Sequence, residues 1–79
     1  MDRQREVEDL GKAEAHIAAG EQRVTEQIER IEQLRAGGHD TSEAEKFLAI
    51  LNSTLRGWQQ HRETILRTIA DIDAGRLPG

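Results

Sequence analysis

Three histidines, His16, His39 and His61, are the side chains of this sequence best suited to catalysis or to metal binding. Cysteine is absent, which excludes thiolate metal ligands, disulfides and a cysteine nucleophile. A metal site in a helical bundle needs a Glu-x-x-His pair or two histidines four residues apart, and neither spacing occurs. We therefore expect solvated histidines and no metal or cofactor. A metal-binding bundle that uses His16, His61 and nearby glutamates is the alternative.

His39 and Asp40 lie in the segment RAGGHDTSEAEKFL, which interrupts an otherwise regular pattern. Gly37 is expected to end one helix in the left-handed conformation, and Gly38 to let the chain reverse. Capping boxes are predicted for Asp40 with Glu43, or for Ser42 with Glu45. The segment is thus interpreted as a loop and a helix cap. General base catalysis needs a cleft and a positioned partner, so we do not expect an enzyme.

Another group that could carry chemistry consists of Glu14, Glu21 and Arg62, which occupy positions where aliphatic residues are expected. One interpretation is a buried acid–base cluster with perturbed pKa values. The favoured interpretation is a register device in which Arg62 bridges to Glu14 or Glu21.

The elements that would position these residues are two amphipathic helices. Glu, Gln, Arg, Ala, Leu and Ile fill the long segments, which is typical of helix. Apolar residues recur every seven positions in both halves. In the first half these are Leu10, Ile17, Val24 and Ile31, with Val7 and Ile28 on the neighbouring position. In the second half they are Ala44, Leu51, Trp58, Ile65 and Ile72, with Leu48, Leu55 and Ile69.

The predicted fold is all-α, an antiparallel two-helix hairpin that forms one domain over residues 1–79. We expect helices at about 3–36 and 41–74, a loop at 37–40 and a frayed tail at 75–79. Facing residues of such a hairpin should have position numbers with a constant sum, and several apolar pairs sum to 79. These pairs are Ile31 with Leu48, Ile28 with Leu51, Val24 with Leu55, Leu10 with Ile69, and Val7 with Ile72.

The segments HIAAGEQRV, QIERIEQL, GHDTSEAEKFL and HRETIL give the sequence a resemblance to a known set of proteins. Between Ala13 and Leu66 it resembles a set of short, uncharacterised bacterial helical-hairpin proteins, with GHDTSEA as the most specific element. The resemblance implies a hairpin and carries no assigned activity.

Apolar residues beside the predicted seam indicate self-association. Leu34, Phe47, Ile50 and Trp58 are the predicted interface residues, on a flank that Ala13, Gly20, Thr54 and Thr68 extend. Trp58 is expected mainly as a core residue, facing the small residues of the first helix. A second hairpin is the simplest cover, so we expect a homodimer that forms a four-helix bundle.

Composition narrows the function further. The net charge is −4 and no basic block occurs, so neither nucleic acid nor a membrane is the expected partner. No signal peptide or membrane-spanning run is recognised, and a cytoplasmic location is expected. The sequence therefore predicts a small protein-interaction or regulatory module that acts through helix association. An unidentified protein is a candidate partner in addition to the second copy. The alternatives are the metal-binding bundle and a DNA-associated factor.

Overall fold

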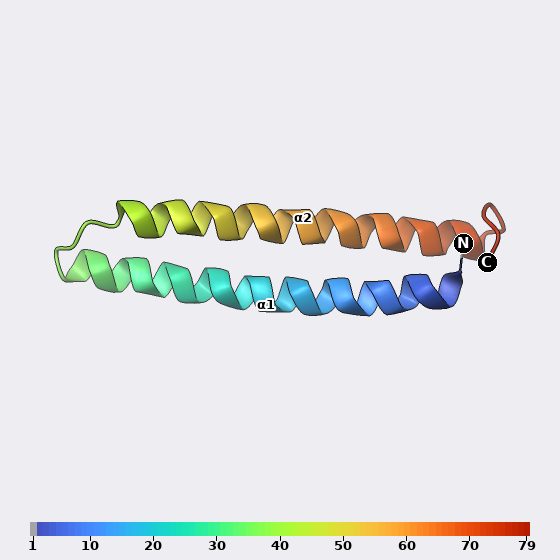
Figure 1. Ribbon diagram of the computed structural model, residues 1–79, viewed down its shortest axis with the longest axis horizontal. Helices are drawn as coiled ribbons and strands as arrows, with labels where there is room; N and C mark the ends of the chain where they lie inside the picture. The colour runs from blue at the N-terminus through green and yellow to red at the C-terminus, as the bar shows by residue number, and fades with distance from the viewer. Residues whose placement is uncertain (1) are drawn as a thin grey trace.

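The computed structural model describes residues 2–79 and shows two long helices side by side (Figure 1). Helix α1 spans Arg3–Ala36 and helix α2 spans Ser42–Asp73. They run antiparallel, with the loop at one end and both termini at the other, in a rod of 59 × 15 × 13 Å. No strand occurs within residues 2–79. The predicted all-helical hairpin is therefore confirmed.

Helix α1 ends in a Schellman motif in which Gly38, and not Gly37, adopts the left-handed conformation. Gly37 has φ −84°, whereas Gly38 has φ +75°. The Gly38 N–H donates to the Arg35 carbonyl at 3.0 Å, and the His39 N–H donates to the Leu34 carbonyl at 2.9 Å. The prediction for Gly37 was wrong by one residue, because the helix continues to Ala36 and the Schellman motif needs positive φ two residues later.

Helix α2 begins without either predicted capping box. Its N-cap is Thr41, whose side chain makes no capping hydrogen bond. Asp40 instead accepts hydrogen bonds from the Ser42 N–H at 2.9 Å and from the Ser42 hydroxyl at 2.6 Å. The Glu43 and Glu45 carboxylates form ion pairs with neighbouring cations. Asp40 thus satisfies a free N–H of the first turn from one position before the cap.

The C-terminal segment folds back over the end of α2. Gly75, with φ +78°, donates its N–H to the Ile72 carbonyl at 3.0 Å, and the Arg76 N–H donates to the Asp71 carbonyl at 2.8 Å. The Arg76 guanidinium also lies 2.6 Å from the Asp71 carboxylate. This is a second Schellman motif, and it turns the last residues toward the helix.

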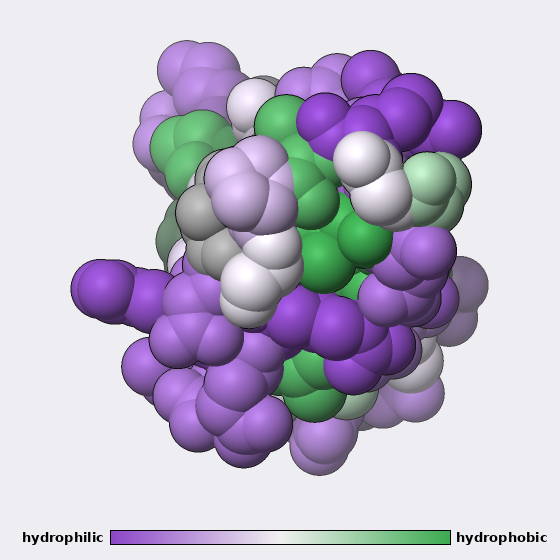
Figure 2. Space-filling model, turned by 90° about the vertical axis from the view of Figure 1, so that its right-hand side faces the viewer, coloured by the Kyte–Doolittle hydropathy of each residue, from purple (hydrophilic) through white to green (hydrophobic). Residues whose placement is uncertain are grey.

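The core is a narrow seam between the two helices. Seen from the end that carries the termini, hydrophobic side chains are visible near the middle of the face, and hydrophilic ones occupy most of its outline (Figure 2). Among residues 2–79 the buried apolar residues are Ala13, Ile31 and Ile65. Helix α2 presents its predicted face to α1. The eight apolar residues predicted to lie on that face are all buried or partly buried, namely Ala44, Leu48, Leu51, Leu55, Trp58, Ile65, Ile69 and Ile72.

Helix α1 presents a different face from the predicted one. Val7 and Ile28 were predicted to lie in the seam beside Leu10 and Ile31. They are 41% and 42% exposed. The row that enters the seam instead flanks Leu10 and Ile31 on the side away from Val7, and it is buried or partly buried. Its members are Ala13, Gly20, Gln27 and Leu34.

The rotation of α1 follows from the residues between Val7 and Ile28. With the predicted face inward, Glu14 and Glu21 would enter the seam, and an unpaired buried carboxylate costs several kcal/mol. Leaving Val7 and Ile28 partly exposed forfeits only about 1 kcal/mol each. The helix therefore buries the row that carries no charge from Ala13 to Leu34.

The alignment of the helices also differs from the predicted one by about one turn. Leu55, predicted to face Val24, lies against Gly20, where a Cβ atom would be 3.2 Å from Leu55 Cδ1. The missing side chain at Gly20 gives Leu55 room to pack close to the backbone of α1.

Candidate functional site

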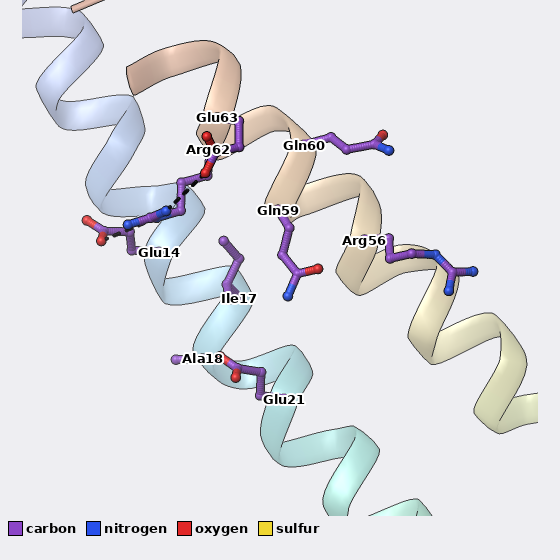
Figure 3. Close-up of a pocket in the computed structure, with 9 residues that line it drawn as sticks. All are labelled: Glu14, Ile17, Ala18, Glu21, Arg56, Gln59, Gln60, Arg62 and Glu63. Atoms are coloured by element: carbon purple, nitrogen blue, oxygen red, sulfur yellow. Dashed lines mark hydrogen bonds and ion pairs between the residues drawn. The ribbon is translucent and has the colours of Figure 1, made fainter. Parts of the chain in front are cut away.

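An open groove of about 740 Å³ lies along one side of the seam, and the charged residues Glu14, Glu21 and Arg62 are among those that line it (Figure 3). Arg62 Nε lies 3.6 Å from Glu14 Oε2, and Arg62 Nη1 lies 3.5 Å from Glu63 Oε1. No ion pair reaches Glu21 among residues 2–79. Of the two predicted pairings, the one with Glu14 is therefore found.

The exposure of these groups decides what the groove can do. The side chains of Glu14 and Glu63 are 52% and 64% exposed, and that of Arg62 is 37% exposed. A buried acid–base cluster is therefore not formed. Exposed ion pairs of this kind contribute between 0 and about 1 kcal/mol, so the cluster acts mainly on helix alignment.

On the opposite side of the seam, the two helical histidines are brought together by Trp58. The His16 ring stacks on the indole with centroids 4.1 Å apart and an interplanar angle of 11°. The His61 ring meets the indole edge-on at 5.8 Å and 67°. The sequence placed these histidines on neighbouring turns of the two helices but did not indicate that Trp58 links them.

This arrangement differs from a metal centre. Trp58 contacts both imidazole rings, and within residues 2–79 no group of three His, Asp or Glu side chains is placed to hold a metal ion. His39 lies apart, in the loop, where its ring packs over Gly37. The histidines therefore form an aromatic cluster and a loop contact.

The four predicted interface residues fall into two groups. Phe47 and Ile50 are 50% and 61% exposed, whereas Leu34 and Trp58 are partly covered by the opposite helix. Ala13 and Gly20, predicted on the same flank, belong to the seam. The two most exposed large apolar residues among residues 2–79 are thus on α2, while Val7 and Ile28 of α1 are exposed to a smaller extent.

Phe47 and Ile50 begin a longer row on α2, which we call the α2 stripe. It repeats with the alternating three- and four-residue spacing that marks one face of a helix. Its members are Phe47, Ile50, Thr54, Gly57, His61, Thr64 and Thr68. It holds neither Asp, Glu, Lys nor Arg, although these make up 33% of the chain. All but Thr68 are exposed.

The threonine hydroxyls at one end of the stripe are already hydrogen-bonded. Thr64 Oγ1 donates to the Gln60 carbonyl at 3.2 Å, and Thr68 Oγ1 donates to the Thr64 carbonyl at 3.0 Å. Burial of these threonines would leave no new polar group unsatisfied. The stripe is therefore less polar than its composition indicates.

Gln27 is a buried polar residue that the sequence reasoning missed. Its Nε2 donates to the Ala44 carbonyl at 2.9 Å across the seam, near the loop. The seven-residue spacing of Gln27 from Gly20 and Leu34 is the signal that could have found it. The bond fixes the helices relative to one another where they diverge into the loop.

Two exposed carboxylates have shifted pKa values. Hydrogen bonds from Ser42, first from its hydroxyl and then from its N–H, lower the pKa of Asp40. A hydrogen bond from Arg3, at 2.7 Å, lowers the pKa of Asp73 and ties the two chain ends together. Both effects belong to the ends of the rod and support the fold.

Neither α1 nor α2 contains an apolar segment of the length that a membrane-spanning helix requires. Comparisons with protein-family models, curated protein sequences and solved structures gave no match.

Proposed function

We propose that this protein is a small interaction module that associates with a second copy of itself through the α2 stripe, forming a four-helix assembly. The observation that supports the proposal is the exposure of Phe47 and Ile50, 50% and 61%, on a helix face without charge. A face of this kind is typical of a helix that packs on both sides.

The size of the core supports the choice of a second copy as the partner. A chain of 79 residues buries little apolar surface, and none of its large side chains in residues 2–79 is fully buried. Small helical proteins of this kind commonly gain stability by association. A second copy is always present with the first, and a two-fold axis lets the same surface serve both.

The groove and the histidine cluster support other functions less well. The groove is open and its charged groups are exposed, so it does not exclude water from a reaction. The histidine rings engage Trp58, which favours a packing role over metal binding. We therefore propose an interaction module and not an enzyme.

The test is sedimentation of the purified protein over a wide concentration range, together with circular dichroism. We expect a dimer whose thermal midpoint rises with protein concentration. Phe47→Glu should shift the protein to a monomer of lower helicity, because it places a charge in the interface. Ala49→Glu, an exposed position of α2 outside the stripe, is the matched control and should remain dimeric. A monomer at every concentration in the unmodified protein would refute the proposal.

A further inference from the structure

We infer that the two copies meet through their α2 helices in antiparallel orientation, with the two-fold axis beside Gly57. This inference rests on the proposed self-association and specifies its geometry. It follows from the order of large and small residues along the α2 stripe.

Gly57 is a glycine that the hairpin itself does not require. A Cβ atom at this position would meet nothing within 4 Å, and the residue has helical conformation in the middle of α2. Glycine costs about 1 kcal/mol relative to alanine in a helix interior. The residue does, however, let another backbone approach closely, as Gly20 does for Leu55 within the hairpin.

The residues on the two sides of Gly57 have complementary sizes. Phe47 and Thr68 lie nearly equally far from Gly57 in opposite directions, and so do Ile50 and Thr64. An antiparallel second copy therefore places Phe47 opposite Thr68 of that copy, and Ile50 opposite its Thr64. Large residues then face small ones, which is how helix surfaces interdigitate. A parallel copy would instead place Phe47 against Phe47.

The basic residues of α1 indicate why α2 makes the central contact. Arg23 and Arg30 lie on the same side as Phe47, where they line a shared cavity. Glu26 lines the same cavity. Pairing of α1 with its own copy on this side would bring two guanidinium groups and one carboxylate of each copy toward those of the other, so each surface would carry a net positive charge. Contact between the α2 helices leaves them at the margin, in solvent.

The experiment uses single cysteines, which are unambiguous because the chain contains none of its own. Gly57→Cys, Ile50→Cys and Gly11→Cys are each oxidised mildly as the full-length protein. Only Gly57→Cys should form a covalent dimer, since a disulfide needs Cα atoms less than about 7 Å apart. In the antiparallel pair the two copies of residue 50 are about 20 Å apart, given the helical rise of 1.5 Å per residue. Gly11→Cys, at an open position of α1, is the control for disulfides that form by random collision of two molecules.

A second variant covers the case in which a side chain at position 57 disturbs the contact. Thr54→Cys and His61→Cys face each other across the proposed axis, so the double variant should cross-link while each single variant does not. Equal cross-linking at positions 50 and 57 would overturn the antiparallel geometry. A dimer by sedimentation that cross-links at neither Gly57→Cys nor the double variant would overturn the inference and leave the proposed function standing. A reduced, unmodified protein that sediments as a monomer would overturn both.

Discussion

Gly38 and Asp40, two residues apart in the loop, control how the chain leaves α1 and enters α2. Gly38 has positive φ and completes the Schellman motif. Asp40 accepts two hydrogen bonds from Ser42. His39, between them, is exposed, and its Cδ2 atom lies 3.0 Å from where a Cβ atom at Gly37 would be. The loop is thus explained by backbone geometry and capping.

Gly38→Val should destabilise the hairpin by at least about 1 kcal/mol, because a β-branched residue is strained at positive φ. Gly37→Ala is the control, since Gly37 has negative φ and its new methyl group would meet only the His39 ring. Urea unfolding followed by circular dichroism measures the difference. Equal losses for the two variants would contradict the assignment of the left-handed conformation to Gly38.

Asp40 should make the stability of the hairpin depend on pH in the acid range. Its pKa in the folded state is lowered from the ordinary value of 3.8, so its contribution is present above that value. The contribution is lost as the pH falls through the lower folded-state pKa, because the protonated carboxyl accepts hydrogen bonds from Ser42 less well. Asp40→Asn should flatten this part of the profile of unfolding free energy against pH. A profile identical to that of the unmodified protein would contradict the role of Asp40.

The seven-residue pattern identifies the buried face of α2 but leaves two choices for α1. In α2 one row of apolar residues faces α1, and the α2 stripe follows a second row. In α1 the row of Leu10 and Ile31 could be accompanied on either side, by the row of Val7 or by that of Ala13. The row of Val7 also contains Glu14 and Glu21, so the row of Ala13 enters the seam instead. Gly20, in that row, lets Leu55 pack close to the backbone of α1.

Gly20 and Gly11 provide a matched pair of substitutions that tests this seam. Gly20→Leu should destabilise the hairpin by about 1–3 kcal/mol, because the new side chain must displace Leu55, whose Cδ1 lies 3.2 Å from the Cβ position. Gly11→Leu should stabilise it by up to about 1 kcal/mol, since its Cβ meets nothing within 4 Å and leucine favours helix. Thermal unfolding of both variants measures the contrast. A Gly20→Leu variant of equal or higher stability would contradict the burial of Gly20 and support the face of α1 predicted from the sequence.

At the scale of the whole molecule, a rod 59 Å long with a seam two helices wide has one face of α2 left uncovered. The α2 stripe runs along most of that helix, and the proposed second copy would cover it. His61 lies in the middle of the stripe, beside Gly57.

His61→Glu should weaken the dimer, because a carboxylate would have to be buried against the second copy. His39→Glu, in the exposed loop, should leave the dimer unchanged. Sedimentation of the two variants measures the effect. Equal weakening by both variants would contradict the placement of His61 in the interface.

The sequence by itself determined the all-helical class, the reversal of the chain at its paired glycines and the face that α2 turns inward. These features depend on local propensity and on periodicity within one segment, which the residues of that segment carry. It also indicated Phe47 and Ile50 as uncovered residues, because both lie outside the inward row of α2.

Only the tertiary structure decided which side of α1 accompanies Leu10 and Ile31, and how far the helices slide past each other. Both sides of α1 have seven-residue spacing, so the pattern alone does not separate them. The choice depends on the cost of burying Glu14 and Glu21 and on the fit of Leu55 against Gly20. These contacts join residues far apart in the chain. Their contribution to the free energy of folding depends on how the two helices pack together.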